Sequence, residues 1–153
     1  MGTREVIKSG LWFAAAGEVP GLCLIFITSA QGPAPAGEVP DYIYKLLVLG
    51  PAVIAGACGM GFGVDILDRS TVNTTWRATL LGIRVACISF LTYMLILAAV
   101  TWVADGRREP LLLLYMVLFY LVGGAVFFGW LIVLVGAAAG WLLYLSSRTA
   151  PRR

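Results

Sequence analysis

Four extended apolar runs, separated by short polar segments, dominate the pattern of this chain. The runs cover residues 9–30, 43–64, 78–104 and 111–145. Each is at least as long as the ~20 residues that a helix needs to cross a hydrocarbon core of ~30 Å. Because lipid offers the backbone no hydrogen-bond partners, spanning segments that lack the alternation of a strand are helical. The pattern therefore predicts an all-α polytopic membrane protein with four transmembrane helices in one domain, residues 1–153.

The composition agrees with this prediction, since 60% of the 153 residues are hydrophobic and 12% are charged. Soluble domains carry ~25% charged residues, so a chain this apolar requires lipid as its solvent. Nine of the 11 basic residues are arginine. That bias is typical of a GC-rich bacterial genome.

The distribution of Lys and Arg between the two ends of the predicted bundle indicates its orientation. With four spans, one side carries both termini, the middle loop and the basic tail 146–153. The basic residues of this side are Arg4, Lys8, Arg69, Arg77, Arg148, Arg152 and Arg153, against Lys45, Arg107 and Arg108 on the other. Basic residues concentrate in cytoplasmic loops. We therefore expect a multi-pass protein of the cell (plasma or inner) membrane with both termini in the cytoplasm.

The last apolar run is longer than a membrane crossing. Residues 111–145 form 35 consecutive uncharged positions. This length corresponds to ~50 Å of helix against a core of ~30 Å, and an average tilt of ~20° does not absorb the excess. Three interpretations stay open: an unusually long helix that projects from the bilayer against another protein, a kink near Gly123-Gly124, or a tight hairpin.

The segment AGEVP occurs twice, at residues 16–20 and 36–40. The second copy ends a polar loop, and Pro40 suits the first position of a helix, where its missing N–H is not needed. The first copy lies inside the first apolar run, where Pro20 frees a carbonyl one turn earlier and predicts a kinked helix. That copy also places Glu18 inside the membrane, where an ionisable side chain is a candidate functional group.

Glu18 and Arg84 are ionisable residues expected at similar depths in two different spans. Glu18 lies about nine residues from the cytoplasmic start of the first span and Arg84 about six from that of the third, which places both at ~10 Å depth. We therefore predict an intramembrane ion pair that ties the first span to the third. The alternatives are that Glu18 forms a proton or substrate site, or that it contacts a neighbouring subunit.

Small residues at intervals of three and four give two of the predicted helices faces on which another backbone can approach closely. The candidate helix-packing positions are Gly56, Gly59 and Gly63 in the second span and Gly129, Gly136 and Gly140 in the last. They serve either packing within the chain or the docking of a helix from another protein.

The chain contains no histidine, and its three cysteines, Cys23, Cys58 and Cys87, fall in three different predicted spans. Histidine is the commonest metal ligand and general base, and these cysteines lack the close spacing of a zinc or iron–sulfur site. We therefore expect no metal, no cofactor and no catalytic residue in this chain. Asp65 and Asp68 form a close acidic pair at a membrane edge, which we interpret as a solvated helix end.

These features favour a non-catalytic accessory subunit that packs against and stabilises a larger integral-membrane complex, whose host is a redox enzyme, an oxygenase or a transporter. The expected partners are other membrane subunits and lipid, and not nucleic acid.

An alternative function comes from the segment Ala16-Gly-Glu18-Val-Pro-Gly21, which resembles the small multidrug resistance exporters. That resemblance implies a small transporter, acting as a homo-oligomer, in which Glu18 exchanges protons for a cationic drug. The chain departs from the family in its longer loops, in its long last run and in Arg84, which would neutralise the glutamate.

Overall fold

The computed structural model describes residues 3–30, 41–68, 72–104, 106 and 109–149, without the side chains of residues 20, 21, 23–30, 41–44, 47 and 149. Its helices are α1 (Thr3–Ala30), α2 (Asp41–Phe62), the short 3-10 helix η1 (Val64–Ile66), α3 (Thr75–Ala104) and α4 (Pro110–Thr149). The prediction of an all-α fold is confirmed. Parts of the predicted tail and loops, including residues 150–153 and Pro40, lie outside the described residues.

The helices follow the predicted apolar runs closely, and their ends have local causes. The side-chain oxygen of Thr74 accepts a hydrogen bond from the N–H of Arg77 at 3.4 Å, which caps the start of α3. Gly106, with a φ of 69°, turns the chain after α3. α2 ends two residues before the predicted position 64, because Gly63 leads into η1, whose Ile66 is buried.

Proline occurs inside two of the helices. α1 continues as one helix through Pro20, whose side chain is not described, so the predicted kink there stays a prediction. Pro51 lies inside α2. Because proline has no N–H, this residue leaves a backbone carbonyl one turn earlier without its helical partner.

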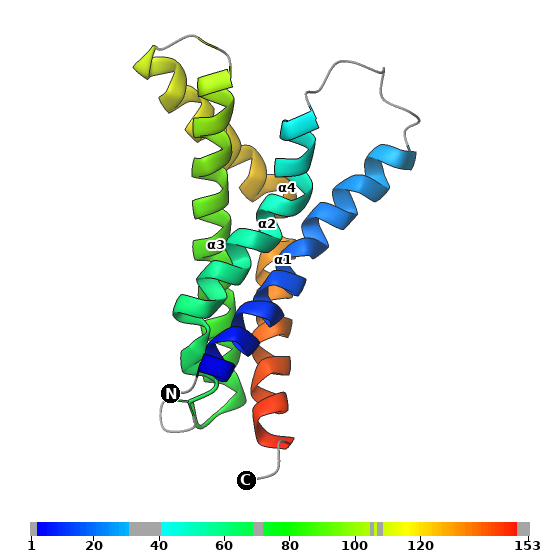
Figure 1. Ribbon diagram of the computed structural model, residues 1–153, viewed down its shortest axis with the longest axis vertical. Coiled ribbons are helices and arrows are strands. Elements are labelled where there is room, and N and C mark those ends of the chain that lie inside the picture. The colour runs from blue at the N-terminus through cyan, green and yellow to red at the C-terminus, as the bar shows by residue number, and fades with distance from the viewer. Residues whose placement is uncertain (1–2, 31–40, 69–71, 105, 107–108, 150–153) are drawn as a thin grey trace.

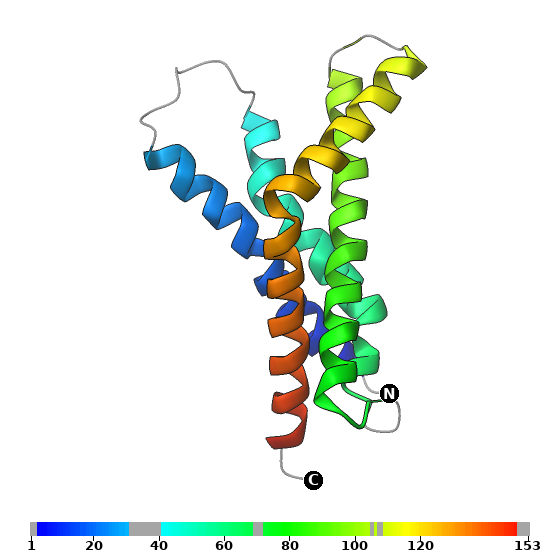
Figure 2. The same ribbon diagram turned by 180° about the vertical axis from the view of Figure 1, so that it is seen from behind.

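The four helices pack as two hairpins, α1 with α2 and α3 with α4 (Figures 1 and 2). They converge at the end of the molecule where both chain termini lie and diverge towards the opposite end (Figure 1). The convergent end holds the hydrophobic core, which includes Phe13, Ile66, Val72, Val85 and Leu143. The two hairpins are therefore held together tightly at one end only.

Backbone contact at glycines holds the α3–α4 hairpin together. A Cβ added to Gly82 would meet the carbonyl oxygen of Gly136 and would lie 2.7 Å from the Cα of Gly140. A Cβ at Gly136 would lie 2.6 Å from the Cβ of Ala86. The two helices approach so closely because no side chain separates them at these positions, an arrangement that is also common between membrane helices.

Small residues also line the contact between α1 and α2. A Cβ at Gly59 would lie 2.6 Å from the Cβ of Phe13, and one at Gly17 would lie 2.8 Å from the carbonyl oxygen of Pro51. Near the start of α1, the buried hydroxyl of Ser9 donates a hydrogen bond to the carbonyl oxygen of Gly59 at 2.9 Å. This contact fixes the register of α1 against α2.

α4 is one helix of 40 residues, so the hairpin interpretation of residues 111–145 is wrong. Its two halves run in different directions, with a bend in the gold part of the ribbon (Figure 2). That part corresponds to the segment around Gly123-Gly124, and glycine pairs are a known cause of helix bending. The kink interpretation therefore accounts for the path of the helix.

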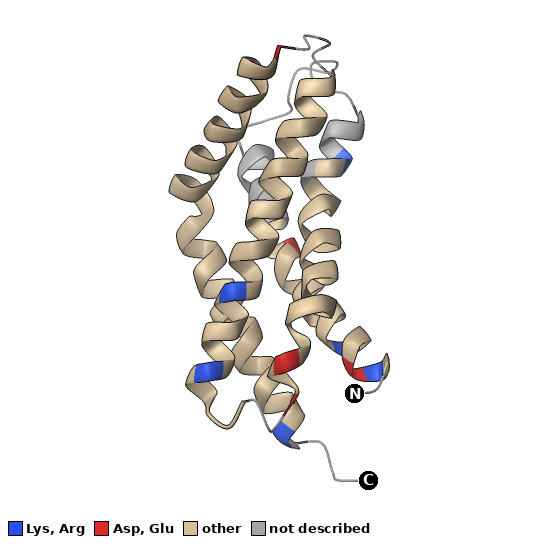
Figure 3. Ribbon diagram, turned by 90° about the vertical axis from the view of Figure 1, so that its left-hand side faces the viewer, with Lys and Arg blue, Asp and Glu red and all other residues tan. Residues whose placement is uncertain are grey.

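Two helices, Thr75–Ala104 and Pro110–Arg148, are long and apolar enough to cross a membrane among the residues whose side chains are described. The apolar part of α2 among these residues, Val48–Phe62, is shorter. Charged residues gather at the end of the molecule that carries the chain termini, and long stretches of helix away from it carry few (Figure 3). These features suggest association with a membrane.

Substitution of Gly82 by alanine tests the backbone contact between α3 and α4. We expect Gly82→Ala to lower the free energy of unfolding by ~1–3 kcal/mol, because its Cβ would force two backbones apart. Gly129→Ala is the matched control, since a Cβ there meets nothing within 4 Å. Thermal unfolding in detergent measures both variants, and equal stability of the two would contradict the contact.

Candidate functional site

An apolar groove of about 370 Å³ lies between the two hairpins. All four helices contribute to it, although α3 and α4 supply most of its surface. The described residues that line it are Phe13, Ala16, Gly17, Pro51, Ala55, Ala86, Ser89, Phe90, Tyr93, Met94, Leu97, Phe119, Tyr120, Gly123, Gly124, Phe127, Phe128, Ile132, Val135 and Gly136. The groove exists because the hairpins are tightly packed internally and diverge from one another (Figure 1).

The polar side-chain groups among these lining residues are three hydroxyl groups, those of Ser89, Tyr93 and Tyr120. Ser89 donates a hydrogen bond to the carbonyl oxygen of Val85 at 2.8 Å, within its own helix. The hydroxyl of Tyr93 donates to the carbonyl oxygen of Leu46 at 3.4 Å, a distance at which such a bond is weak. In the part of the chain that the structure describes, no hydrogen bond is recorded for the hydroxyl of Tyr120.

Aromatic rings form much of the α4 side of the groove. The rings of Phe119 and Tyr120 meet edge to face at 5.7 Å between centroids. Phe119 and Phe127 both line the groove and are also 61% and 72% exposed, so they form its outer rim. The groove therefore opens sideways, out of the helix bundle.

Two adjacent glycines of α4 make different contacts in the groove wall. A Cβ at Gly124 would lie 2.9 Å from the ring of Phe90, so this glycine packs directly against α3. A Cβ at Gly123 would meet nothing within 4 Å. The wall is therefore closed at Gly124 and leaves free space beside Gly123.

The described residues give no support to the predicted ion pair between Glu18 and Arg84, which stays a prediction. Atom Oε2 of Glu18 is buried and has no hydrogen-bond partner, and the Arg84 side chain is exposed. Arg84 and Tyr93 are nine residues, or about two and a half turns, apart on α3. Because Tyr93 lines the groove, Arg84 on the opposite side of α3 points away from it. α1, the helix that carries Glu18, packs mainly on α2. The pairing rested on equal depth, which does not specify which helices are neighbours.

Five of the six predicted helix-packing glycines are used within the chain. Gly56, Gly59 and Gly63 face Ala14, Phe13 and Ser9 of α1. Gly136 and Gly140 face α3, where a Cβ at Gly140 would meet the carbonyl oxygen of Ala78 and lie 2.9 Å from the Cα of Gly82. Gly129 is the exception, because a Cβ there would meet nothing within 4 Å. Five of these positions are consequently covered by the chain's own helices.

The described side chains include no group of three His, Cys, Asp or Glu residues that could hold a metal ion. Cys58 is buried as a free thiol, Cys87 is half-buried, and the side chain of Cys23 lies outside the described set. Asp65 is exposed at the surface of η1.

Comparison of the chain with known protein families, characterised proteins and solved structures finds no match.

Sequence reasoning did not find the groove, and the reason is its composition. Its lining consists of apolar and aromatic residues that any membrane helix carries, and it comes from all four helices. The available signal is local: Gly123-Gly124 lies between aromatic pairs, Phe119-Tyr120 before it and Phe127-Phe128 after it. Small residues flanked by large rings on one helix indicate a hollow beside that helix.

A double-mutant cycle tests the separation of Glu18 and Arg84. We expect the effects of Glu18→Gln and Arg84→Gln on the free energy of unfolding to add within ~0.5 kcal/mol, as for residues without direct contact. Thermal unfolding of the four proteins in lipid nanodiscs measures this coupling. A favourable coupling above ~1 kcal/mol would show that the two side chains form a pair.

Proposed function

We propose that this chain is a four-span protein of a bacterial cell membrane and serves as a non-catalytic subunit of a larger integral-membrane complex. α1 has 28 residues and α2 has 22. Both therefore reach the ~20 residues of a membrane crossing, as α3 and α4 do. We infer that the convergent end, which carries the basic residues Arg4, Lys8, Arg77 and Arg148, faces the cytoplasm, because basic residues concentrate in cytoplasmic loops.

The observation that carries the subunit proposal is the apolar surface along the whole of α4. Leu111 near its start is 76% exposed, and Leu145 near its end is 39% exposed. These residues are ~51 Å apart along a helix at 1.5 Å per residue. This path is longer than a ~30 Å core, and α4 bends near Gly123-Gly124, so its two halves lie at different tilts. We infer that part of the exposed apolar surface is covered by a protein partner.

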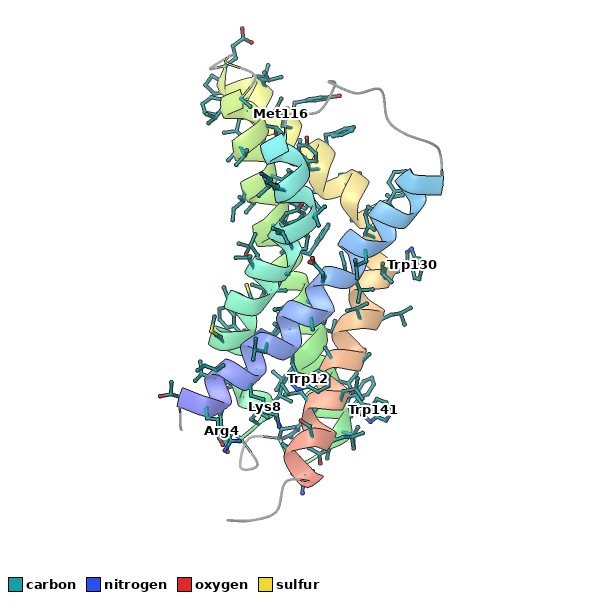
Figure 4. The ribbon with its side chains drawn as sticks, turned by 45° about the vertical axis from the view of Figure 1, so that its right-hand side comes forward. Arg4, Lys8, Trp12, Met116, Trp130 and Trp141 are labelled. Carbon is teal, nitrogen blue, oxygen red and sulfur yellow. The ribbon has the colours of Figure 1, made fainter. Side chains whose placement is uncertain are left out.

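Trp130 gives this surface a feature typical of protein interfaces. Its side chain projects away from the other helices (Figure 4), and it is 64% exposed. Its indole N–H already donates to the carbonyl oxygen of Phe127 at 3.2 Å, so the ring can be buried without an unpaired donor. Exposed aromatic residues are enriched in the centres of protein–protein interfaces. Trp130 and the neighbouring Val126 thus form the proposed centre of contact on α4.

Co-purification with a matched pair of variants tests this function. A tagged chain is extracted from its native membrane in mild detergent and analysed by native mass spectrometry. We expect a stoichiometric foreign membrane subunit that is lost from Val126→Ala/Trp130→Ala, with affinity reduced ~30-fold, the effect of losing ~2 kcal/mol at an interface centre. The control Leu91→Ala/Leu95→Ala truncates exposed leucines of α3 and is expected to retain the partner.

The opposite outcome would be a chain isolated alone or only with copies of itself, which would overturn the subunit proposal. Retention of the partner by Val126→Ala/Trp130→Ala would place the contact elsewhere than on this part of α4.

A transport function through Glu18 is the second candidate, and one observation favours it. The Oε2 atom of Glu18 is buried and makes no hydrogen bond. An intramembrane carboxyl group with such an unpaired oxygen is suited to carrying a proton or binding a cation. Efflux of a cationic drug from proteoliposomes, driven by a pH gradient and lost in Glu18→Gln, would support this candidate.

A further inference from the structure

The groove between the hairpins is accessible from the side, and this determines where an occupant comes from. Its rim residues Phe119 and Phe127 belong to α4, one of the two helices that are long and apolar enough to cross a membrane. An opening on such a helix faces the hydrocarbon. The occupant is therefore a molecule dissolved in the membrane.

The charge of the lining limits the occupant further. No Asp, Glu, Lys or Arg occurs among the described residues that line the groove. Glu18 is not one of them, and Arg84 lies on the opposite side of α3. A fatty-acid carboxylate or a phosphate headgroup would bring a charge into apolar surroundings without a partner, at a large free-energy cost. The occupant is therefore neutral.

The two phenol groups determine which polar atoms the occupant carries. Tyr93 of α3 makes one long hydrogen bond at 3.4 Å, and none is recorded for the hydroxyl of Tyr120 in the described structure. A phenol O–H in apolar surroundings requires an acceptor. A ligand with carbonyl oxygens supplies that acceptor without adding a charge or a donor of its own.

The shape and size of the groove favour a flat ring. Rings of Phe90, Phe119, Phe127 and Phe128 line it, and aromatic rings pack by stacking or edge to face. Its volume of about 370 Å³ falls in the range of small-molecule sites, roughly 300–1,000 Å³. The free space beside Gly123 admits a ligand at the middle of the α4 wall.

We propose that this groove binds a membrane-soluble molecule of the quinone class, a neutral ring with carbonyl acceptors that receives a hydrogen bond from Tyr120. The rings of the lining hold its flat face, and its apolar tail leaves past the rim formed by Phe119 and Phe127. This proposal rests on the membrane crossing proposed above but not on the accessory-subunit role, because every residue that lines the groove belongs to this chain.

The experiment is photolabelling of the full chain in phosphatidylcholine nanodiscs with an azidoquinone, followed by peptide mass spectrometry. We expect saturable labelling of α3 and α4 peptides that line the groove, with competition by decylubiquinone. Gly123→Leu is expected to abolish this labelling by filling the free space. Gly129→Leu on the same helix, equally open but outside the groove, is expected to leave it unchanged.

A second pair of variants tests the hydrogen bond without changing the packing. We expect Tyr120→Phe to raise the decylubiquinone concentration needed for half-competition about fivefold, the effect of one neutral hydrogen bond. Tyr115→Phe, an exposed tyrosine of α4 outside the lining, is the control. Thermal unfolding confirms that each variant is folded.

Two results would overturn the proposal. Labelling that decylubiquinone does not displace, and that a diazirine-bearing hydrocarbon reproduces, would show that lipid chains fill the groove without recognition of a ring. Equal competition in the wild type and Tyr120→Phe would show that the phenol does not bind the ligand.

Discussion

Close contact between helix backbones governs how the helices of this chain pack. Lipid is as apolar as the side chains, so membrane helices associate through van der Waals packing at small residues. Gly82 meets Gly136 and Gly140 across α3 and α4, and Gly17 meets Pro51 and Ala55 across α1 and α2. Each hairpin is consequently a pair of helices with little space for side chains between them.

The space between the hairpins is filled differently at the two ends of the molecule. At the convergent end, Phe13, Ile66 and Leu143 are almost fully buried and join the hairpins through a continuous core. The hydrogen bond from Tyr144 to the carbonyl oxygen of Asn73, at 3.3 Å, ties the end of α4 to the segment before α3. Beyond this core the hairpins diverge, and the bend of α4 widens the separation (Figure 2). The groove is thus a direct consequence of tight pairing within hairpins and looser packing between them.

Polar groups inside the helices show which interactions the chain provides for itself. Ser89 and Thr101 each donate a hydrogen bond to a carbonyl oxygen of the preceding turn at 2.8 Å, which satisfies a hydroxyl without any partner helix. The buried Oε2 atom of Glu18 makes no hydrogen bond of this kind within its own helix or to another helix. The hydroxyl of Tyr120, at the groove, also makes no hydrogen bond within the described part of the chain, although this residue is only half-buried. These two groups, with the exposed surface of α4, are where the chain is best suited to meet something outside itself.

The four helices and their approximate ends could be predicted from the sequence alone. The length of an apolar run is a local signal, so it can be found without knowledge of neighbouring helices. The packed helices were needed to show that Arg84 faces away from the groove, that five glycines face the chain's own helices, and that residues of four helices form a groove. These facts could not be predicted because the helices are apolar on nearly every side. Their pattern therefore does not specify rotation about the helix axis or the choice of neighbour, which depend on packing between residues far apart in the chain.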